Sequence, residues 1–371
     1  MMKKIKGFMV VGMFAHVAGA AGDFTASEHL EFLLKAEEKW AGGKYTDDVK
    51  VYADVAVTQL NRQTARFEEL SDSRKDNSVN LTWIKSCGLE TSAADLDADV
   101  CEISADELES DAQTYEYTLG QKVGFSVDAE KIRTNIYELE EQIAHGILRC
   151  DKLLSEWWAK QLLVSYDSFQ GPNIPVIQGG KIPNFTWNGT DGWAEIAAGN
   201  YNVEIVAALI KMMQLNKINN GFFVEDGGLF IPWKNAGLDS GNLDGKGNDM
   251  RTMQIDLNFD MWNFSPAGIS QNMFLLDRNA VAMKTYNRYP TAPQVLTGKI
   301  NQTRYAYPSK ILPGVMYDVV YEMACGTNGS PMHKWQFFTK GGIWLNPTAC
   351  PIAVGEAEYT PTGVYGFKVT A

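Results

Sequence analysis

The sequence has few of the residues that bind metals or act as nucleophiles. Only four histidines occur among 371 residues, and the five widely spaced cysteines form no C-x-x-C pair. That spacing suits neither a zinc site nor a disulfide framework, so buried free thiols are the simplest interpretation. No H-E-x-x-H, G-x-S-x-G, Walker or dinucleotide-binding motif is present. The sequence therefore predicts a protein that is not an enzyme and that has no cofactor.

Three short patterns resemble known metal-binding motifs, but each lacks a residue that the motif requires. His145 follows Glu141 on one face of a predicted helix, but the bundle di-iron pattern needs Glu-x-x-His, and residue 142 is Gln142. Acidic residues alternate at 95, 97 and 99 as in an EF-hand loop, but Val100 stands where that loop requires glycine. The loop at 239–249 has Gly241 in place of a ligand. An irregular cation site remains an open alternative, because oxygen-rich loops bind hard cations without a standard motif.

Charge of one sign predominates in each of two long segments. Residues 89–130 hold twelve acidic residues and one basic residue, Lys122, and so account for nearly all of the net charge of -12. Residues 279–317 show the opposite bias, with five Lys or Arg and no Asp or Glu. The negative net charge disfavours a conventional nucleic-acid binder, which attracts phosphate through clustered Lys and Arg. The chain thus carries one strongly acidic segment and one distant basic segment.

No apolar run is long enough to cross a bilayer core of about 30 Å. The opening segment, residues 1–22, has Lys3, Lys4 and Lys6, then an apolar stretch that ends in small residues. These features are typical of a secretory signal peptide. The same composition suits an N-terminal arm that packs on a neighbouring subunit, and the residues alone leave both interpretations open.

Helical patterns dominate the first half of the chain. Thr25 and Glu28 have the spacing of a capping box at the start of an amphipathic helix, and a second helix is predicted at 47–70. From 79 to 127 the β-branched and aromatic content predicts two long strands with the acidic segment between them. A long helix follows at 128–169, with Asp128 as its cap. An isolated hairpin is marginal in water, so we expect the strands at 79–127 to need support from elsewhere.

The second half is predicted to be richer in strands. A helix or pair of helices is predicted at 193–220, a strand at 221–226, a loop at 235–249 and a strand at 252–264. The segment 271–287 suggests a strand that enters a helix. The remainder, including 314–325, 334–347 and 363–371, reads as strands.

This order of parts resembles the major capsid protein of tailed bacteriophages, which has the Hong Kong 97-type shell fold. The stretch GFSVDAEKIRTNIYELEEQIAHGILRCDKLL, a strand running into a long helix, and NMFLLDRNAVAMKTYN carry the likeness. The resemblance implies an α+β fold with an N-terminal arm with helices at 1–73, an extended β loop at 74–127, and a spine helix with a peripheral domain at 128–190. An axial domain at 191–290 and the remaining axial and peripheral strands at 291–371 complete it.

The resemblance also implies a function: a subunit that self-assembles through hexamers and pentamers into an icosahedral shell in the virion, built in the host cytoplasm. The shell would enclose double-stranded DNA without sequence-specific contact, with portal, scaffold or decoration proteins as further candidate partners and no membrane. In such shells the extended loop lies across an adjacent subunit. The candidate contact residues are acidic side chains of one copy and basic side chains of the next: Asp97, Asp99, Glu102, Asp106, Glu107 and Glu109, and Lys284, Arg288, Lys299, Arg304 and Lys310.

Two alternatives stay open at this point. An acidic loop is often a solvated surface with no partner, because most charged residues are exposed. A secreted bacterial surface or adhesion protein with a cleaved signal peptide would also explain the opening segment.

Overall fold

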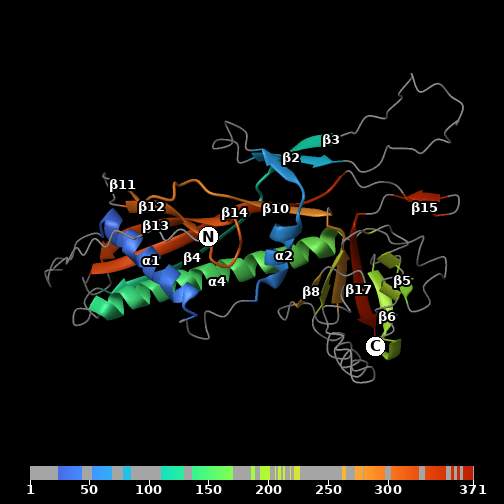
Figure 1. Cartoon of the computed structure of the whole chain (residues 1–371), viewed down its shortest axis with the longest axis horizontal. Coiled ribbons are helices and arrows are strands. Elements are labelled where there is room, and N and C mark those ends of the chain that lie inside the picture. Colours follow the sequence, from blue (N-terminus) through green and yellow to red (C-terminus); the bar gives the residue numbers. More distant parts are fainter. Residues whose placement is uncertain are drawn as a thin grey trace, which may run out of the picture.

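The computed structural model describes a little over half of the chain, and its fold is mixed α+β (Figure 1). The described residues are 24–43, 52–68, 78–84, 110–128, 136–169, 185–188, 193–200, 205, 208–209, 212–213, 218, 221–225, 261–264, 272–278, 280–296, 302–325, 331–347, 352–354, 357–359 and 362–370.

The main helices lie together on one side of a sheet. The first, α1, begins at the predicted capping box, where the backbone N–H of Thr25 donates to the Glu28 carboxylate at 2.7 Å. The longest, α4, runs across the molecule, and α1 and α2 pack against it (Figure 1). In the described parts of the chain, no helix is both long and apolar enough to cross a membrane. The bounds are α1 Ala26–Ala41, α2 Asp54–Arg62, α4 Ile136–Phe169 and the 3-10 helix η2 Ala198–Asn200.

The larger part of the core lies beneath α4, on the first sheet. Its strands follow the order β10-β14-β13-β12-β11. The long strand β14 pairs with β13 along one edge and with β4 along the other, since Phe338 lies opposite both Asp318 and Lys122. The bounds are β4 Leu119–Asp128, β10 Val281–Tyr286, β11 Gln294–Leu296, β12 Gln302–Pro308, β13 Met316–Cys325 and β14 Pro331–Leu345.

A second sheet lies at the C-terminal end of α4 (Figure 1). Its order is β5-β6-β17-β9-β7-β8, and Tyr166 of α4 packs against Phe274 of β9 at a ring distance of 5.9 Å. The bounds are β5 Thr186–Asn188, β6 Trp193–Ala197, β7 Phe222–Glu225, β8 Met261–Phe264, β9 Asn272–Leu276 and β17 Val364–Thr370. A separate two-stranded pair is β15 Ile352–Val354 with β16 Ala357–Tyr359.

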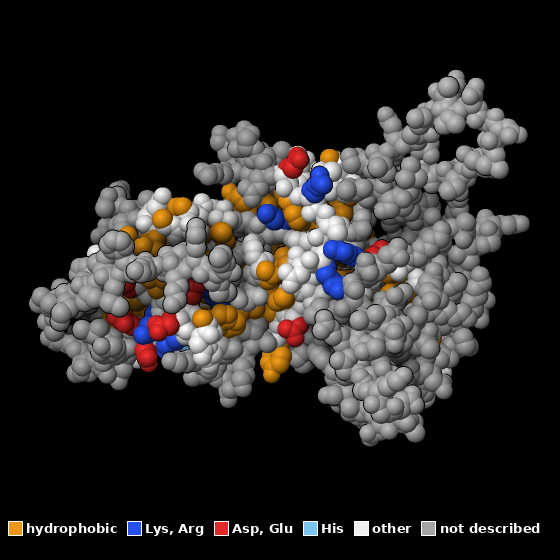
Figure 2. Space-filling model, viewed as in Figure 1, with side chains coloured by type: hydrophobic (Ala, Val, Ile, Leu, Met, Phe, Trp, Pro, Cys, Tyr) orange, Lys and Arg blue, Asp and Glu red, His pale blue; other side chains and the backbone are white. Residues whose placement is uncertain are grey.

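Alternation of side chains explains how one core forms between α4 and the first sheet. Residues two apart on a strand share a face, so Trp335 and Phe337 both point toward α4 and are buried. The Trp158 indole of α4 donates to the Thr339 hydroxyl at 2.9 Å. Charged side chains of both signs gather near the crossing of α1 and α4 (Figure 2), where Lys39 pairs with Glu141.

The base of the predicted hairpin is supported by other parts of its own chain. β2 pairs with β3, and β1 adds a third strand. Val79, Leu81 and Trp83 alternate along β2 and are buried in a separate small core with Trp344 of β14. The support comes from the face of the first sheet that α4 does not cover. The bounds are β1 Arg66–Glu68, β2 Ser78–Ile84 and β3 Ser110–Glu116.

Several predicted elements are corrected. The helix predicted at 47–70 is shorter, because α2 ends at Arg62 and β1 follows. The segment at 193–197 is strand β6, although helical residues occur further on, at 205, 208–209 and 212–213. No helix follows β9, because the next element is strand β10. Asp128 ends strand β4, and the described part of α4 begins at Ile136.

Candidate inter-subunit surface

The face of the first sheet that points away from α4 carries a group of basic side chains. Because side chains alternate along a strand, the pairing register places Lys122 of β4 and Arg304 of β12 on this face. Lys334 and Lys340 of β14 lie on this face too. Arg288, just after β10, lines a surface depression together with Lys122 and Lys340. We call this surface the basic face, and it comprises Lys122, Arg288, Arg304, Lys334 and Lys340.

The basic face is hollowed rather than flat. Two adjacent depressions, of about 550 and 720 Å³, share the half-buried side chains of Val320 and Phe338. Arg304 and Lys334 line the first depression, and the other three cations line the second. The surface thus combines an apolar centre with positive charge around it, an arrangement typical of protein contacts with a hydrophobic core and a polar rim.

Arg304 is held in place by its neighbours. Its guanidinium donates two hydrogen bonds to Gln302 Oε1, at 2.7 and 3.3 Å, and lies 5.5 Å from the ring centre of Tyr289. The Gln302 amide in turn donates to Glu322 at 3.2 Å. A cation held in one position loses less side-chain entropy when it pairs with a carboxylate than a mobile cation does.

Two carboxylates, Asp318 and Glu322, lie among the cations of the basic face. Asp318 is buried and accepts hydrogen bonds from the backbone N–H groups of Arg288 and Tyr289, at 2.9 to 3.1 Å. Burial raises the pKa of Asp318, and these hydrogen bonds oppose the rise. Partial burial and the neighbouring charge of Arg288 lower the pKa of Lys340. Among the described residues no ion pair joins these five cations to a carboxylate, although Glu322 lies opposite Lys334 on the neighbouring strand. The basic face therefore carries more positive than negative charge.

The structure separates the basic residues that the sequence grouped at 284–310. Arg288 and Arg304 lie on the basic face. Lys284 of β10 instead lies under the small three-stranded sheet, with its ammonium 5.5 Å from the ring centre of Phe67. Lys310 pairs with Glu37 of α1 at 3.0 Å, on the helix side of the sheet. Neighbours along the chain are thus divided between two sides of one sheet.

The remaining predicted contact residues lie outside the described residues. They are Lys299 and all six acidic candidates, Asp97, Asp99, Glu102, Asp106, Glu107 and Glu109. The register from Ser78 with Glu116 to Ile84 with Ser110 shows that the acidic segment connects the far ends of β2 and β3.

Three members of the basic face were not predicted from the sequence: Lys122, Lys334 and Lys340. They belong to two strands that are far apart in the sequence, so no local charge run marks them. The sequence signal that could have identified Lys334 and Lys340 is the alternation of polar and buried residues along β14. In HKWQFFTK, polar residues at 334, 336 and 340 alternate with buried residues at 335, 337 and 339, which predicts that the two lysines share an open sheet face.

Among the described residues, no group of three or more His, Cys, Asp or Glu side chains is placed to share a metal ion. Cys150 of α4 is a buried free thiol, and burial is the main cause that raises its pKa to about 12. The near-miss pair Glu141 and His145 lies on α4 as predicted, with Glu141 paired to Lys39 at 3.8 Å.

No protein-family model matches the chain, and no curated protein matches it. Several solved structures are similar over most of its length. One from Mycobacterium phage Che8 has 13% identity and a TM-score of 0.38, over 82% of this chain and 92% of that one. The mature capsid of bacteriophage PhiM1 has 12% identity and a TM-score of 0.31, over 79% and 82%. The virus-like particle from Pyrococcus furiosus has 8% identity and a TM-score of 0.40, over 92% and 100%. The similar structures include capsid structures of several tailed phages.

Proposed function

We propose that the chain is a structural subunit that self-assembles into an icosahedral phage capsid enclosing double-stranded DNA, with the Hong Kong 97-type fold. In this proposal residues 1–73 are the arm, 74–127 the extended loop and 128–190 the spine helix with a peripheral domain. Residues 191–290 form the axial domain, and 291–371 supply the remaining strands. The site of action is the virion, after assembly in the host cytoplasm.

The element order supports this function. The paired strands β2 and β3 are followed by β4 and then by α4, a helix of 34 residues. At a rise of 1.5 Å per residue α4 is about 50 Å long, and it packs against both sheets. A long rigid helix that joins two sheets gives a subunit with contact surfaces far apart, as a closed shell requires.

The single observation that carries the proposal is charge complementarity within one chain. The segment 95–111 contains eight carboxylates and no Lys or Arg, whereas the basic face has five cations and two carboxylates, Asp318 and Glu322. We propose that the acidic segment of one subunit docks on the basic face of the next. Each exposed pair contributes at most about 1 kcal/mol, so the charges determine register and choice of partner more than affinity.

A charge exchange tests this contact. Arg304→Glu combined with Lys334→Glu should prevent particle formation at low ionic strength, as seen by light scattering and negative-stain imaging. Lys368→Glu, at an exposed position of β17 away from the basic face, is the matched control and should assemble normally. Adding Asp97→Lys and Asp99→Lys to the first pair should restore particles, because opposite charges then face one another again. Normal assembly of the Arg304→Glu, Lys334→Glu variant would show that the contact is wrong.

A further inference from the structure

The first depression of the basic face contains one row of paired residues that crosses four strands. In order along the row they are Gly124, Gln336, Val320 and Arg304. Gly124 leaves its end of the row without a side chain, and a β-carbon there would lie 2.6 Å from the backbone oxygen of Trp335. The depression has a volume of about 550 Å³ and is lined by all four residues of the row. Arg304 therefore stands beside a space that the close pairing of β4 and β14 helps to keep open.

Arg304 is oriented by a neutral side chain. The Gln302 oxygen accepts both hydrogen bonds from the guanidinium, and the Gln302 amide N–H donates to the Glu322 carboxylate. A guanidinium only donates and a carboxylate only accepts, so Gln302 satisfies both neighbours in one orientation alone, with its oxygen toward Arg304. Gln302 thus fixes the guanidinium and at the same time separates its charge from that of Glu322.

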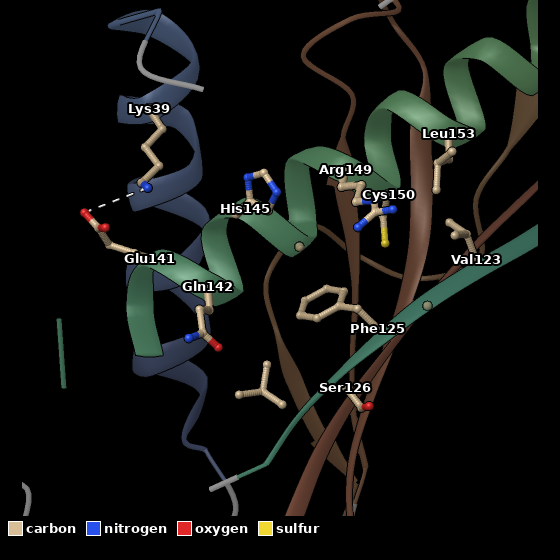
Figure 3. Close-up of a pocket in the computed structure, with 13 residues that line it drawn as sticks. Lys39, Val123, Phe125, Ser126, Glu141, Gln142, His145, Arg149, Cys150 and Leu153 are labelled. Atoms are coloured by element: carbon tan, nitrogen blue, oxygen red, sulfur yellow. Dashed lines mark ion pairs between the residues drawn. The ribbon is translucent and has the colours of Figure 1, made fainter. Parts of the chain in front are cut away.

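A cation on the other side of the sheet is held in a different way. In the hollow between β4 and α4, the Lys39 ammonium lies 3.8 Å from the Glu141 carboxylate (Figure 3). There the residue that holds the cation also neutralises it. Gln302 holds Arg304 without neutralising it, because an amide has no charge. Arg304 is therefore both positioned and charged, which are the two properties needed to bind an incoming anion.

The end of the Arg304 guanidinium has the geometry that a carboxylate requires. The hydrogen bonds to Gln302 use the Nε and Nη2 atoms, along one side of the group. Two parallel N–H groups at its end match the two oxygens of a carboxylate. Lys334 lines the same depression but is a point charge on a flexible chain, without such a fork. Arg304 therefore fixes the position of a bound carboxylate, whereas Lys334 adds attraction only.

We propose that Arg304 is the anchor of the docking contact. It receives one carboxylate of the acidic segment, residues 95–111, of the next subunit in a pair of parallel hydrogen bonds, and Gln302 is its positioning residue. The inference rests on the docking contact proposed above, and it names the side chain that sets the register within the basic face. Lys122, Lys334 and Lys340 contribute attraction without fixing a position.

Peptide binding tests the anchor. The probe is a fluorescently labelled synthetic peptide of residues 95–111, and its binding to the full-length chain, kept too dilute to assemble, is measured by fluorescence anisotropy at low ionic strength. Arg304→Lys keeps the charge but loses the fork, so it should weaken peptide binding about fivefold. Lys334→Arg, an exchange of like charge in the same depression, is the matched control and should change binding by less than about twofold.

A double-mutant cycle tests the role of Gln302. Gln302→Ala should weaken peptide binding about threefold in the wild-type background and should have no effect in the Arg304→Ala background, because Gln302 acts only through Arg304. An equal loss in both backgrounds would show that Gln302 merely supports the sheet. Circular dichroism checks that each variant stays folded.

The docking contact and the anchor fail in different ways. A wild-type chain that does not bind the peptide would contradict the docking contact, and the anchor with it. Peptide binding that Arg304→Lys leaves unchanged, or that Arg304→Lys and Lys334→Arg weaken equally, would overturn the anchor alone. A loss of about fivefold confined to Arg304→Lys supports the anchor.

Discussion

The ring of Phe125 occupies the space that any side chain at residue 146 would need: a β-carbon placed on Gly146 would lie 2.7 Å from that ring. This contact explains a glycine in the interior of a 34-residue helix, where glycine costs about 1 kcal/mol relative to alanine. This close approach brings strand β4 directly against helix α4.

Gly146→Ala should therefore destabilise the protein, although alanine is the better helix former. Overpacking costs about 1–3 kcal/mol, which exceeds the gain of about 1 kcal/mol in helix propensity. Urea denaturation measures the change in unfolding free energy. Gly199→Ala is the control, because nothing lies within 4 Å of a β-carbon at that position. Equal or greater stability of the Gly146→Ala variant would contradict the close packing of Phe125.

Asp151 of α4 should make stability depend on pH. Its buried carboxylate accepts hydrogen bonds from the Ser309 hydroxyl at 2.6 Å and from the Lys310 backbone N–H at 2.8 Å. Burial nevertheless raises its pKa from 3.8 to about 6. The native state therefore holds the proton more tightly than the unfolded state, so this residue's contribution to stability falls as pH rises from about 4 to about 6, by about 3 kcal/mol.

Asp151→Asn removes that titration. The unfolding free energy of the wild type minus that of the variant should decrease between pH 4 and pH 6 and then level off. Urea denaturation at several pH values gives this difference directly, because other titrating groups are common to both proteins. A difference that stays constant across this range would show that Asp151 is ionised throughout.

His29 of α1 should make stability depend on pH in the opposite direction from Asp151. It is fully buried among aromatic rings, and neither of its ring nitrogens has a hydrogen-bond partner in the described structure. Burial, with repulsion from His333 as a smaller cause, lowers its pKa from 6.5 to about 4. The unfolded state therefore takes up the proton first, and stability should fall as pH drops from about 6.5 to 4, by about 3 kcal/mol. His29→Leu should lose this acid sensitivity. An unchanged pH profile for that variant would place the sensitivity elsewhere.

Assembly through the basic face should weaken as salt is added. The Debye length falls from about 30 Å at 0.01 M to about 3 Å at 1 M ionic strength, so exposed charge pairs lose most of their attraction. Lys122→Glu should raise the protein concentration needed for assembly at low salt and have little effect at high salt, as measured by light scattering. An equal effect of Lys122→Glu at both salt concentrations would indicate a packing role for this residue rather than a charge role.

The sequence correctly predicted those elements that depend on residues close together in the chain. The Thr25 capping box and the end of α4 at Phe169 match the structure, as do strands β7, β13, β14 and β17. The error at 271–287 has a physical cause: Val281, Ala282 and Met283 are buried on both faces of a strand, so they show neither alternation nor helical period. The sequence predicted that the hairpin needs support, but it did not identify Trp344 as the contact, because Trp344 lies far along the chain.

The candidate site was predicted only in part, for a related reason. Arg288 and Arg304 were identified as neighbours in a basic run, but the strands bring them together with Lys334 and Lys122. Lys310 is not part of the basic face, because it forms an ion pair with Glu37 of α1 on the helix side of the sheet. Charge runs show where charge lies along the chain, whereas strand pairing decides which charges share a surface.

The size distribution of the purified full-length protein tests the central claim most directly. Negative-stain imaging together with light scattering, over a range of protein concentrations at low ionic strength, should show closed particles of uniform diameter. A folded monomer at every concentration, with no larger species, would contradict a shell subunit.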